Sequence, residues 1–246
     1  MASGLLVLLV GRSTRLSRYV MDLQKTYTAT ARLGAVSDTL DAEGEVTHLD
    51  TLPAEDALRE ALPALTGDIL QIPPMVSALK REGKRLYDLH RQGITVEREP
   101  RPVTVHRFDL TTFDPAGKTA SFEISCSSGT YVRTLIADLA ERAGSGAYLT
   151  ALRRTTVGHL TVQHAPSPEE LTPKSLYNHI IQPAEVVGHL PGTAVSGAER
   201  DSVCHGGRTE RLGVQGSYRV MCGDELLAVY RDQGEQGRAE VVLCAG

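Results

Sequence analysis

The chain turns from a strand into a helix at Ser125-Cys126-Ser127-Ser128-Gly129-Thr130-Tyr131-Val132-Arg133-Thr134-Leu135, and this turn decides the fold of its central part. Small residues and a glycine allow the backbone to bend sharply there. The N-terminus of the helix favours an anion. Tyr131 and Arg133 fall in the first helical turn, so both can project into a cleft. Arg133 suits a buried carboxylate or a phosphate, and a capped helix with an ordinary surface arginine is the alternative.

The segments on either side of this turn show clear periodicity. Val103–Phe113 and Thr119–Ser125 alternate as two strands, and the residues between them form a turn. Thr130–Ala143 has the apolar stripe of an amphipathic helix, and Gly144 ends it. The centre of the chain is therefore predicted to pair two antiparallel strands and to cover them with a helix.

Further upstream, Lys25–Leu33 alternates as a half-buried strand that carries Tyr27. Tyr27 suits core packing, and it also suits stacking on a base that has been turned out of an RNA stack. Residues 53–70 are predicted to be helical. Gln71-Ile72-Pro73-Pro74 follows and cannot be regular helix, because each proline lacks a donor and the first restricts its neighbour.

Residues 79–107 are locally basic, although the whole chain has a net charge of −4. The net charge excludes a diffuse basic surface for nonspecific nucleic-acid binding. Four acidic residues in this segment stand against eight basic ones, which are Lys80, Arg81, Lys84, Arg85, Arg91, Arg98, Arg101 and Arg107. A rigid Pro-Pro loop that delivers such a segment suits a contact with an RNA backbone, and a solvated helix face is the alternative.

The composition indicates a globular protein without a metal motif. Hydrophobic residues make up 41% and charged residues 23%, which excludes global disorder. The eight histidines are scattered and match no metal-binding or triad motif. The four cysteines show no C-x-x-C spacing, so we expect reduced thiols and neither a zinc site nor a disulfide framework. They are Cys126, Cys204, Cys222 and Cys244.

The two ends of the chain differ in character. Leu5–Val10 is predicted to be a fully buried strand, followed by a short helix near residues 13–20. The run lacks the basic start of a signal peptide and is far shorter than the ~20 apolar residues that span a bilayer, so we expect no membrane association. Residues 165–195 are rich in Pro and His, which suggests a domain boundary. Residues 196–246 show short strands between glycine turns, which predicts a small β-barrel.

Taken together, these stretches resemble the TruB-type tRNA pseudouridine synthases over nearly the whole chain. The opening family motif, G-T-L-D-P-x-A-[ST]-G-x-L, is matched only in its tail, by Ala2-Ser3-Gly4. Residues 196–246 resemble the PUA-type module of many members. The resemblance implies an α/β (α+β) fold, with a mixed, mostly antiparallel sheet flanked by helices and a small C-terminal PUA-like β-barrel. The other matches are Lys25-Thr26-Tyr27, residues 32–44, Gln71–Tyr87, Ser128–Leu135, Gly146–Leu149 and Leu152–Thr155.

The resemblance implies an isomerase that converts a uridine of the tRNA T-loop (tRNA position 55) to pseudouridine without a metal or cofactor. The glycosidic C1′–N1 bond breaks, the uracil turns, and a C–C bond forms through C5. Arg133 resembles the family arginine that pairs with a catalytic aspartate. Tyr27 resembles the tyrosine that stacks on the target base and is proposed to move a proton. Tyr131 is expected to lie beside the site and shape it.

Substrate-binding residues are implied in the same way. Leu152 resembles the apolar residue that packs near the base. The expected contacts with tRNA phosphates come from Arg153, Arg154, Lys80, Lys84 and Arg85. The expected partner is the T-stem-loop of tRNA, with no protein partner and no membrane, and the protein is expected to be a cytoplasmic monomer.

The sequence departs from the family pattern at its start. Aligned on Ala2-Ser3-Gly4, the catalytic aspartate belongs two residues before Met1. Asp22, Asp38 and Asp41 lie elsewhere in the pattern, and surface turns or a structural role near the site explain them better. Either Met1 is an internal methionine of a longer protein, or the product is short and is an inactive tRNA-binding or tRNA-folding protein. A truly short chain is expected to leave Arg133 unpaired and its sheet without an opening strand and catalytic loop.

The expected domain organisation has three parts. Residues 1–170 form the pseudouridine synthase catalytic domain without its N-terminal part. Residues 171–195 form a linker with a short helix. Residues 196–246 form the PUA-like RNA-binding module, and a stand-alone binding function of this module is a third, weaker hypothesis.

Overall fold

The computed structural model describes residues 2–81 and 83–244, which divide into two compact units. The first unit consists of the residues up to Leu6 together with Leu23–His164. The second consists of Val7–Asp22 together with the residues from Ala165 onward. Residues 7–22, which the sequence-based division places in the N-terminal domain, therefore pack in the second unit.

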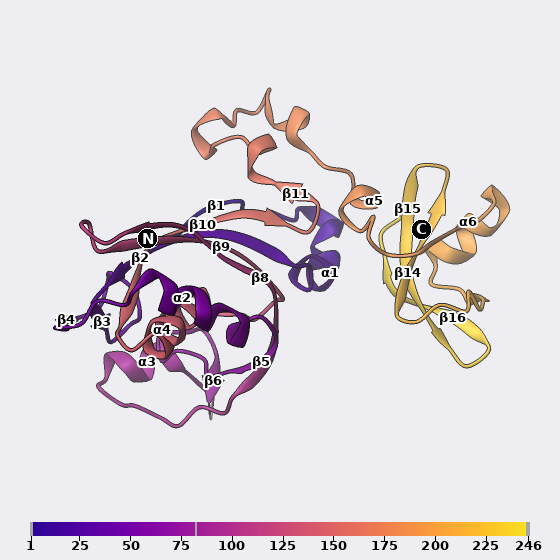
Figure 1. Ribbon diagram of the computed structural model, residues 1–246. Coiled ribbons are helices and arrows are strands. Elements are labelled where there is room, and N and C mark those ends of the chain that lie inside the picture. The colour runs from indigo at the N-terminus through magenta and orange to yellow at the C-terminus, as the bar shows by residue number, and fades with distance from the viewer. Residues whose placement is uncertain (1, 82, 245–246) are drawn as a thin grey trace. The chain divides into compact units, whose positions relative to one another are not determined.

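A seven-stranded sheet organises the first unit (Figure 1). Its strands follow the order β1-β10-β2-β9-β8-β5, and β11 pairs with β10. Among the described strands, β1 and β10 pair in parallel and the other neighbours are antiparallel, which confirms the mixed, mostly antiparallel sheet. The strands are β1 (Ala2–Gly4), β2 (Lys25–Leu33), β5 (Gly67–Gln71), β8 (Arg101–Asp114), β9 (Thr119–Cys126), β10 (Ala147–Val157) and β11 (Leu160–Thr161).

Two helices, α2 (Glu55–Ala61) and α4 (Val132–Arg142), lie on the same side of this sheet (Figure 1). Leu135 and Leu139 of α4 are fully buried in the main core, and Gly144, with a φ of 78°, follows the helix. The predicted helix and its glycine stop are thereby confirmed. The same core takes its sheet residues from β2, β8, β9 and β10.

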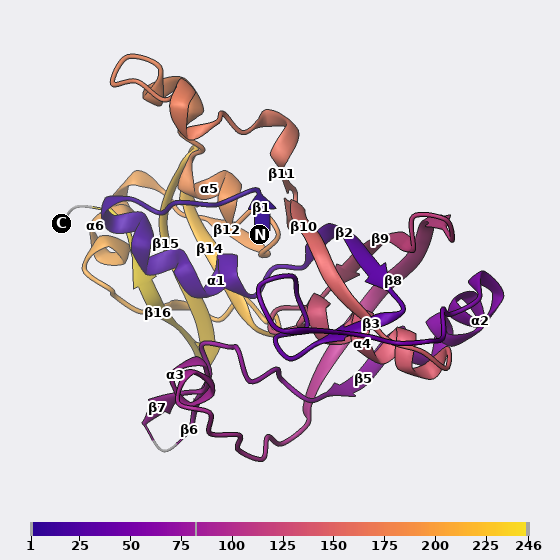
Figure 2. The same ribbon diagram turned by 90° about the vertical axis from the view of Figure 1, so that its left-hand side faces the viewer.

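Smaller elements complete the first unit. The hairpin of β3 (Ala35–Ser37) and β4 (Val46–His48) encloses an acidic turn. The short hairpin of β6 (Lys80–Arg81) and β7 (Lys84–Arg85) leads directly into α3 (Leu86–Arg91), and the three elements lie together in Figure 2. A 3-10 helix at Val162–His164 ends the unit.

The helix predicted for residues 53–70 is correct in its first part and wrong in its last. After α2, a 3-10 helix covers Leu62–Leu65, and the chain then enters β5. Gly67, with a φ of 92°, is the first residue of β5 and allows the turn into the strand. Ile69 then pairs with Val103, so pairing with a distant strand overrides the local preference.

The buried strand predicted for Leu5–Val10 is wrong. Pairing with β10 ends where the Leu5 N–H donates to the Arg154 carbonyl (2.8 Å). Beyond it, Leu6, Leu8 and Val10 are 69%, 72% and 78% exposed. An apolar run signals a buried strand only where neighbouring strands cover it, and no strand pairs with residues 5–10 among the residues described.

The second unit contains a five-stranded sheet of order β12-β14-β15-β16-β13. Tyr218, Val220 and Tyr230 form its buried centre. The strands are β12 (Gly192–Ala194), β13 (Thr209–Glu210), β14 (Ser217–Cys222), β15 (Glu225–Gln233) and β16 (Gln236–Val242). The helical segments are a 3-10 helix at Gly11–Leu16, α1 (Ser17–Met21), 3-10 helices at Pro168–Glu170 and Leu176–His179, α5 (Pro183–Val186) and α6 (Gly197–Cys204).

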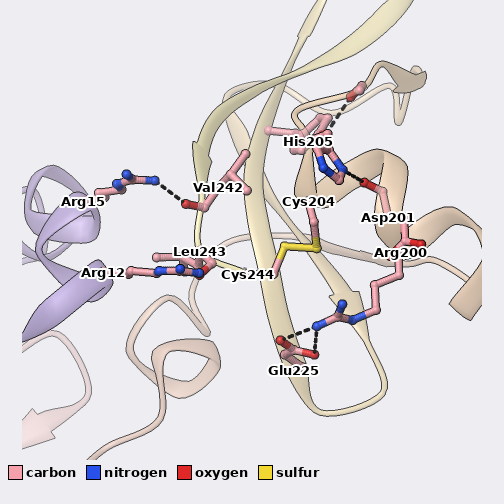
Figure 3. Close-up of a disulfide and its surroundings, with 12 residues drawn as sticks. Arg12, Arg15, Arg200, Asp201, Cys204, His205, Glu225, Val242, Leu243 and Cys244 are labelled. Atoms are coloured by element: carbon pink, nitrogen blue, oxygen red, sulfur yellow. Dashed lines mark hydrogen bonds and ion pairs between the residues drawn. A yellow bond between two sulfur atoms is a disulfide. The ribbon is translucent and has the colours of Figure 1, made fainter. Parts of the chain in front are cut away.

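The N-terminal segment 7–22 is built into this unit. Leu16 and Tyr19 are buried in a second apolar cluster with Val187 and Leu243. Side chains of the segment also donate to the end of β16: Arg15 to the Val242 carbonyl (2.9 Å) and Arg12 to the Leu243 carbonyl (3.3 Å), as Figure 3 shows. The segment is therefore part of the C-terminal unit's core.

A disulfide joins Cys204, the last residue of α6, to Cys244 (Figure 3). This corrects the expectation of four reduced thiols, because Cys126 and Cys222 are the free cysteines. The two bonded residues are 40 positions apart in sequence, so spacing alone gives no signal for the pair. Among the described residues, no helix has both the length and the apolar character needed to cross a bilayer.

Candidate active site

The turn before α4 is held by β8. The Ser127 N–H donates to the Thr104 carbonyl (2.8 Å), and the Thr104 N–H donates to the Ser127 hydroxyl (2.9 Å). Gly129 has a φ of 84°, which an L-residue rarely adopts. This fixed turn delivers Tyr131 and Arg133 to one side of the unit.

Arg133 is held by three acceptors. Its guanidinium donates to the Asp41 carboxylate (2.6 Å), the Thr39 carbonyl (3.1 Å) and the Val76 carbonyl (2.6 Å). The side chains of Arg133 and Asp41 are only 18% and 8% exposed, so the ion pair is largely shielded from water. The expectation of an unpaired Arg133 in a chain that begins at Met1 is therefore wrong.

Asp41 is fixed by the acidic turn between β3 and β4. One carboxylate oxygen accepts from the Thr39 hydroxyl (2.7 Å) and from the Glu43 N–H (3.1 Å). Burial alone would raise the pKa of Asp41, but the hydrogen bonds from Thr39, Glu43 and Arg133 outweigh it and hold that pKa below its ordinary value. Asp41 is therefore a carboxylate at neutral pH.

Tyr27 reaches the same place from β2. It pairs with Ile124 of β9 on one side and with Arg154 of β10 on the other. Burial raises the pKa of the Tyr27 phenol, Cys126 adds to the rise, and the charge of Arg154 opposes it. The phenol is therefore protonated at neutral pH. Leu152 lies two residues before Arg154 on β10, opposite Ala2 and Ala29.

These side chains line one cavity of about 380 Å³, within the range of about 300–1,000 Å³ that is usual for small-molecule sites. Four sequence-predicted site residues, Tyr27, Tyr131, Arg133 and Leu152, come together here. The other lining residues are Ala2, Asp41, Glu43, Thr130 and Val132.

The remaining predicted residues lie outside the cavity wall. Arg153 is exposed on β10, and Arg154 donates to the Leu5 carbonyl (2.7 Å). Lys80, Lys84 and Arg85 lie on the β6–β7 hairpin, all exposed. The Arg85 guanidinium donates to the Tyr87 hydroxyl (2.8 Å) and lies over its ring, and Arg91 also lies over that ring.

Sequence reasoning set Asp41 aside, although it is the carboxylate that meets Arg133. The signal that could have found Asp41 is the tight acidic turn around it, in which Thr39 and Gly44 flank the aspartate and the Thr39 hydroxyl binds its carboxylate. A Cβ at Gly44 would meet the side-chain oxygens of Asp38, Thr39 and Ser37, so the turn is closely packed at this position. No group of three or more His, Cys, Asp or Glu side chains suited to a metal ion occurs in residues 2–81 and 83–244.

Solved structures share this fold. A chain from the crystal structure of a Cbf5-Nop10-Gar1 complex aligns with a TM-score of 0.72 at 20% identity, covering 99% of this chain and 73% of that one. A chain from the archaeal box H/ACA sRNP Nop10-Cbf5 complex aligns with a TM-score of 0.65 at 21% identity, covering 99% and 74%. The expected fold class, including the small PUA-like C-terminal module, is confirmed.

Two relatives are more similar to this chain in sequence than the solved structures are. The "tRNA pseudouridine synthase B" of Azoarcus sp. (strain BH72) is 41% identical over 93% of this chain and 77% of its own length. The protein of the same name from Dechloromonas aromatica (strain RCB) is 39% identical over 96% and 79%. Residues 1–132 match the model of the TruB family pseudouridylate synthase (N terminal domain). The chain therefore belongs to the TruB family of pseudouridylate synthases, which makes it an isomerase by family.

Proposed function

We propose that this protein isomerises a uridine in the T-loop of tRNA, at tRNA position 55, to pseudouridine. Its relatives in Azoarcus and Dechloromonas are named tRNA pseudouridine synthase B. The observation that carries the proposal is the meeting of Tyr27, Tyr131, Arg133 and Leu152 around one cavity. An aromatic ring and an apolar side chain suit the faces of a base that has left its stack.

Tyr27 and Leu152 bind the target uracil in this proposal. The C1′–N1 bond breaks, the uracil turns, C5 bonds to C1′, and the C5 proton is lost while N1 gains one. Because burial keeps the Tyr27 phenol protonated, Tyr27 takes a proton from C5 only after its own proton has passed to solvent, which also supplies the proton that N1 gains. Arg154 lowers the cost of that step, because its charge favours the phenolate.

Arg133 orients a carboxylate at the sugar. The family resemblance places the catalytic aspartate two residues before Met1, hence three residues before Ala2, and Ala2 lies in the cavity wall. Arg133, already held by Asp41, Thr39 and Val76, is oriented before the substrate arrives. In this proposal Asp41 holds the arginine and does not attack the sugar, since its carboxylate is already engaged by three donors.

The phosphates of the T-stem-loop meet Arg153 and the exposed side chains of the β6–β7 hairpin, Lys80, Lys84 and Arg85. Arg154, which contacts Leu5 and Tyr27, is proposed to reach a phosphate near the target nucleotide. A local basic hairpin supplies this attraction despite the negative net charge of the chain.

Residues 1–170 are proposed to catalyse, residues 171–195 to link, and residues 196–246 to bind RNA as a PUA-like module. We further propose that the protein is a monomer, acts without a protein partner and works in the cytoplasm. An isolated fragment 196–246 would lose the packing of Leu16 and Tyr19. A fair binding test of the module therefore includes residues 7–22.

The function is tested by tritium release from tRNA labelled at C5 of its uridines. The 246-residue chain is assayed beside a form extended to the next upstream in-frame start. Release only by the extended form supports the proposal, with the aspartate supplied by the extension. Release by the 246-residue chain overturns the placement of the catalytic aspartate before Met1, because an acid within these 246 residues must then act. If neither form releases tritium and both still bind tRNA, an inactive tRNA-binding protein is favoured.

A further inference from the structure

Gln71 is a buried polar residue at the edge of the large sheet. It is the last residue of β5, where its backbone pairs with Arg101 of β8, and it is only 2% exposed. A buried amide needs hydrogen-bond partners. Within the described part of the chain, the hydrogen-bond partners of its side chain are the backbone N–H and carbonyl of Tyr131.

Two hydrogen bonds join Gln71 and Tyr131. The Tyr131 N–H donates to the Gln71 side-chain oxygen (2.7 Å), and the Gln71 side-chain nitrogen donates to the Tyr131 carbonyl (3.1 Å). The side-chain amide thus imitates a neighbouring peptide group and fixes the Tyr131 backbone from both sides. One orientation of the amide satisfies both bonds, so the contact is specific in direction.

Tyr131 is the residue from which α4 starts. Its backbone is extended (φ −98°, ψ 105°), and no side chain caps the helix at this position. Its carbonyl also accepts the Leu135 N–H (3.1 Å), the first hydrogen bond of the helix. Residues 130–133 all line the cavity, so the position of the Tyr131 backbone sets the position of that wall.

A second hydrogen bond to α4 is made by Val76, five residues after Gln71. The Val76 carbonyl accepts from Arg133 (2.6 Å), two residues after Tyr131. The Pro-Pro loop is thereby joined to the start of α4 at Gln71 and again at Val76. If the two hydrogen bonds between Gln71 and Tyr131 are lost, the first turn of α4 is free to shift, and Arg133 shifts relative to Asp41.

We propose that Gln71 is a positioning residue for the reaction, which fixes the Tyr131 backbone and through it aims Arg133 at the reacting sugar. The inference rests on the proposed function. Gln71 is absent from the cavity wall, so it acts through Tyr131 and Arg133 without touching the substrate.

The variant Gln71→Glu gives a test in which pH decides whether the side chain can still donate to the Tyr131 carbonyl. A protonated carboxyl group has one donor and one acceptor, as the amide does here, whereas a carboxylate has no donor for the Tyr131 carbonyl. Burial raises the pKa of the introduced group and brings its titration into a usable range. Relative to wild type at each pH, kcat should be at least about tenfold lower at pH 8 and should recover at pH 5.5, with KM for tRNA changed less than about twofold.

Two controls separate positioning from simple destabilisation. Gln71→Leu cannot form either hydrogen bond, so its kcat should stay low at both pH values. Leu65→Ala removes a core side chain of the same unit that is outside the cavity wall, so it should lower the unfolding temperature and leave kcat unchanged. Equal losses in all three variants, or a Gln71→Glu variant without recovery at low pH, would overturn the assignment.

Amide hydrogen exchange tests whether Gln71 fixes the Tyr131 backbone and requires no measurement of catalysis. The Tyr131 N–H should lose protection in Gln71→Leu, and α4 up to Leu135 should lose part of it, whereas Leu65→Ala should spare Tyr131. If wild type shows no turnover in any form, the proposed function fails on its own. Unchanged protection of Tyr131 in Gln71→Leu would instead remove Gln71 from the positioning role.

Discussion

Arg133 and Asp41 form an ion pair at 2.6 Å although 92 residues separate them in the sequence. The pair closes one wall of the cavity and leaves the guanidinium with backbone acceptors on two further sides. Since both groups are largely shielded from water, removing either partner leaves the other without compensation.

Arg133→Ala should abolish turnover in a catalytically active form while tRNA binding is kept, because the residue acts on the reacting nucleotide. Asp41→Asn should lower kcat by at least about 100-fold and destabilise the first unit by about 3 kcal/mol, as expected when one partner of a shielded pair is lost. Single-turnover rates and filter binding on the same samples check both changes. Weakened binding with normal turnover at saturation would assign the pair to substrate capture.

Changing Lys84 and Arg85 to Ala should weaken tRNA binding and reduce the slope of log K against log salt by about 2, as for two lost phosphate contacts. Arg59 and Arg142 changed to Ala form the matched control, since they remove two charges from α2 and α4. The measurement is tRNA affinity across a series of salt concentrations. An equal change of slope in both double variants would show that total charge, and not the hairpin, attracts the tRNA.

Stability of the second unit should depend on pH through Glu240. Burial would raise the pKa of its carboxyl, but hydrogen bonds from Arg18, Ser217, Arg231 and Tyr19 lower it from 4.5 to about 2. As the pH falls, the Glu240 carboxyl takes up its proton at a higher pH in the unfolded chain than in the folded protein. Its contribution to the free energy of unfolding is therefore fully present above pH 4.5 and is lost as the pH drops toward 2.

The expected loss across this window is about 3 kcal/mol, the equivalent of the lowered pKa. Urea unfolding followed at Tyr218 and Tyr230 between pH 7 and pH 2.5 measures it. Glu240→Gln should flatten that dependence, whereas Glu225→Gln, at an exposed pair with Arg200, should leave it intact. A wild-type curve that is flat below pH 4.5 would contradict the prediction.

Removing the disulfide should destabilise the second unit by about 4 kcal/mol, the loop-closure estimate for a loop of this length. Cys244→Ser and treatment with a thiol reductant should have equal effects in thermal unfolding. Cys222→Ser is the control, because Cys222 is free and lies in the same sheet. A reductant that leaves the unfolding temperature of wild type unchanged would mean that the bond adds nothing to stability.

The sequence predicts best the elements whose signals are local. The helix α4, its glycine stop and the strands β8 and β9 follow from periodicity and turn residues close by. The local sequence points to Tyr27, Tyr131 and Arg133 as candidate site residues, the family resemblance adds Leu152, and the structure shows that the four side chains line one cavity.

Features that depend on distant partners were missed. Leu5–Val10 has the composition of a core strand, and only pairing could reveal its exposure. Asp41 was read as part of a surface turn because its partner, Arg133, lies on another element. Cys204 and Cys244 have no spacing signal, since their bond depends on how α6 and the end of β16 pack.

The assignment of residues 7–22 to the second unit has a consequence for biosynthesis. These residues leave the ribosome long before their core partners Val187 and Leu243. The first unit can complete its sheet once β11 has emerged, whereas Leu16 and Tyr19 must wait, with their apolar side chains uncovered, until Val187 and Leu243 have also emerged. A segment that is made before most of the first unit is therefore expected to fold after it, and a chaperone can act on the segment throughout that interval.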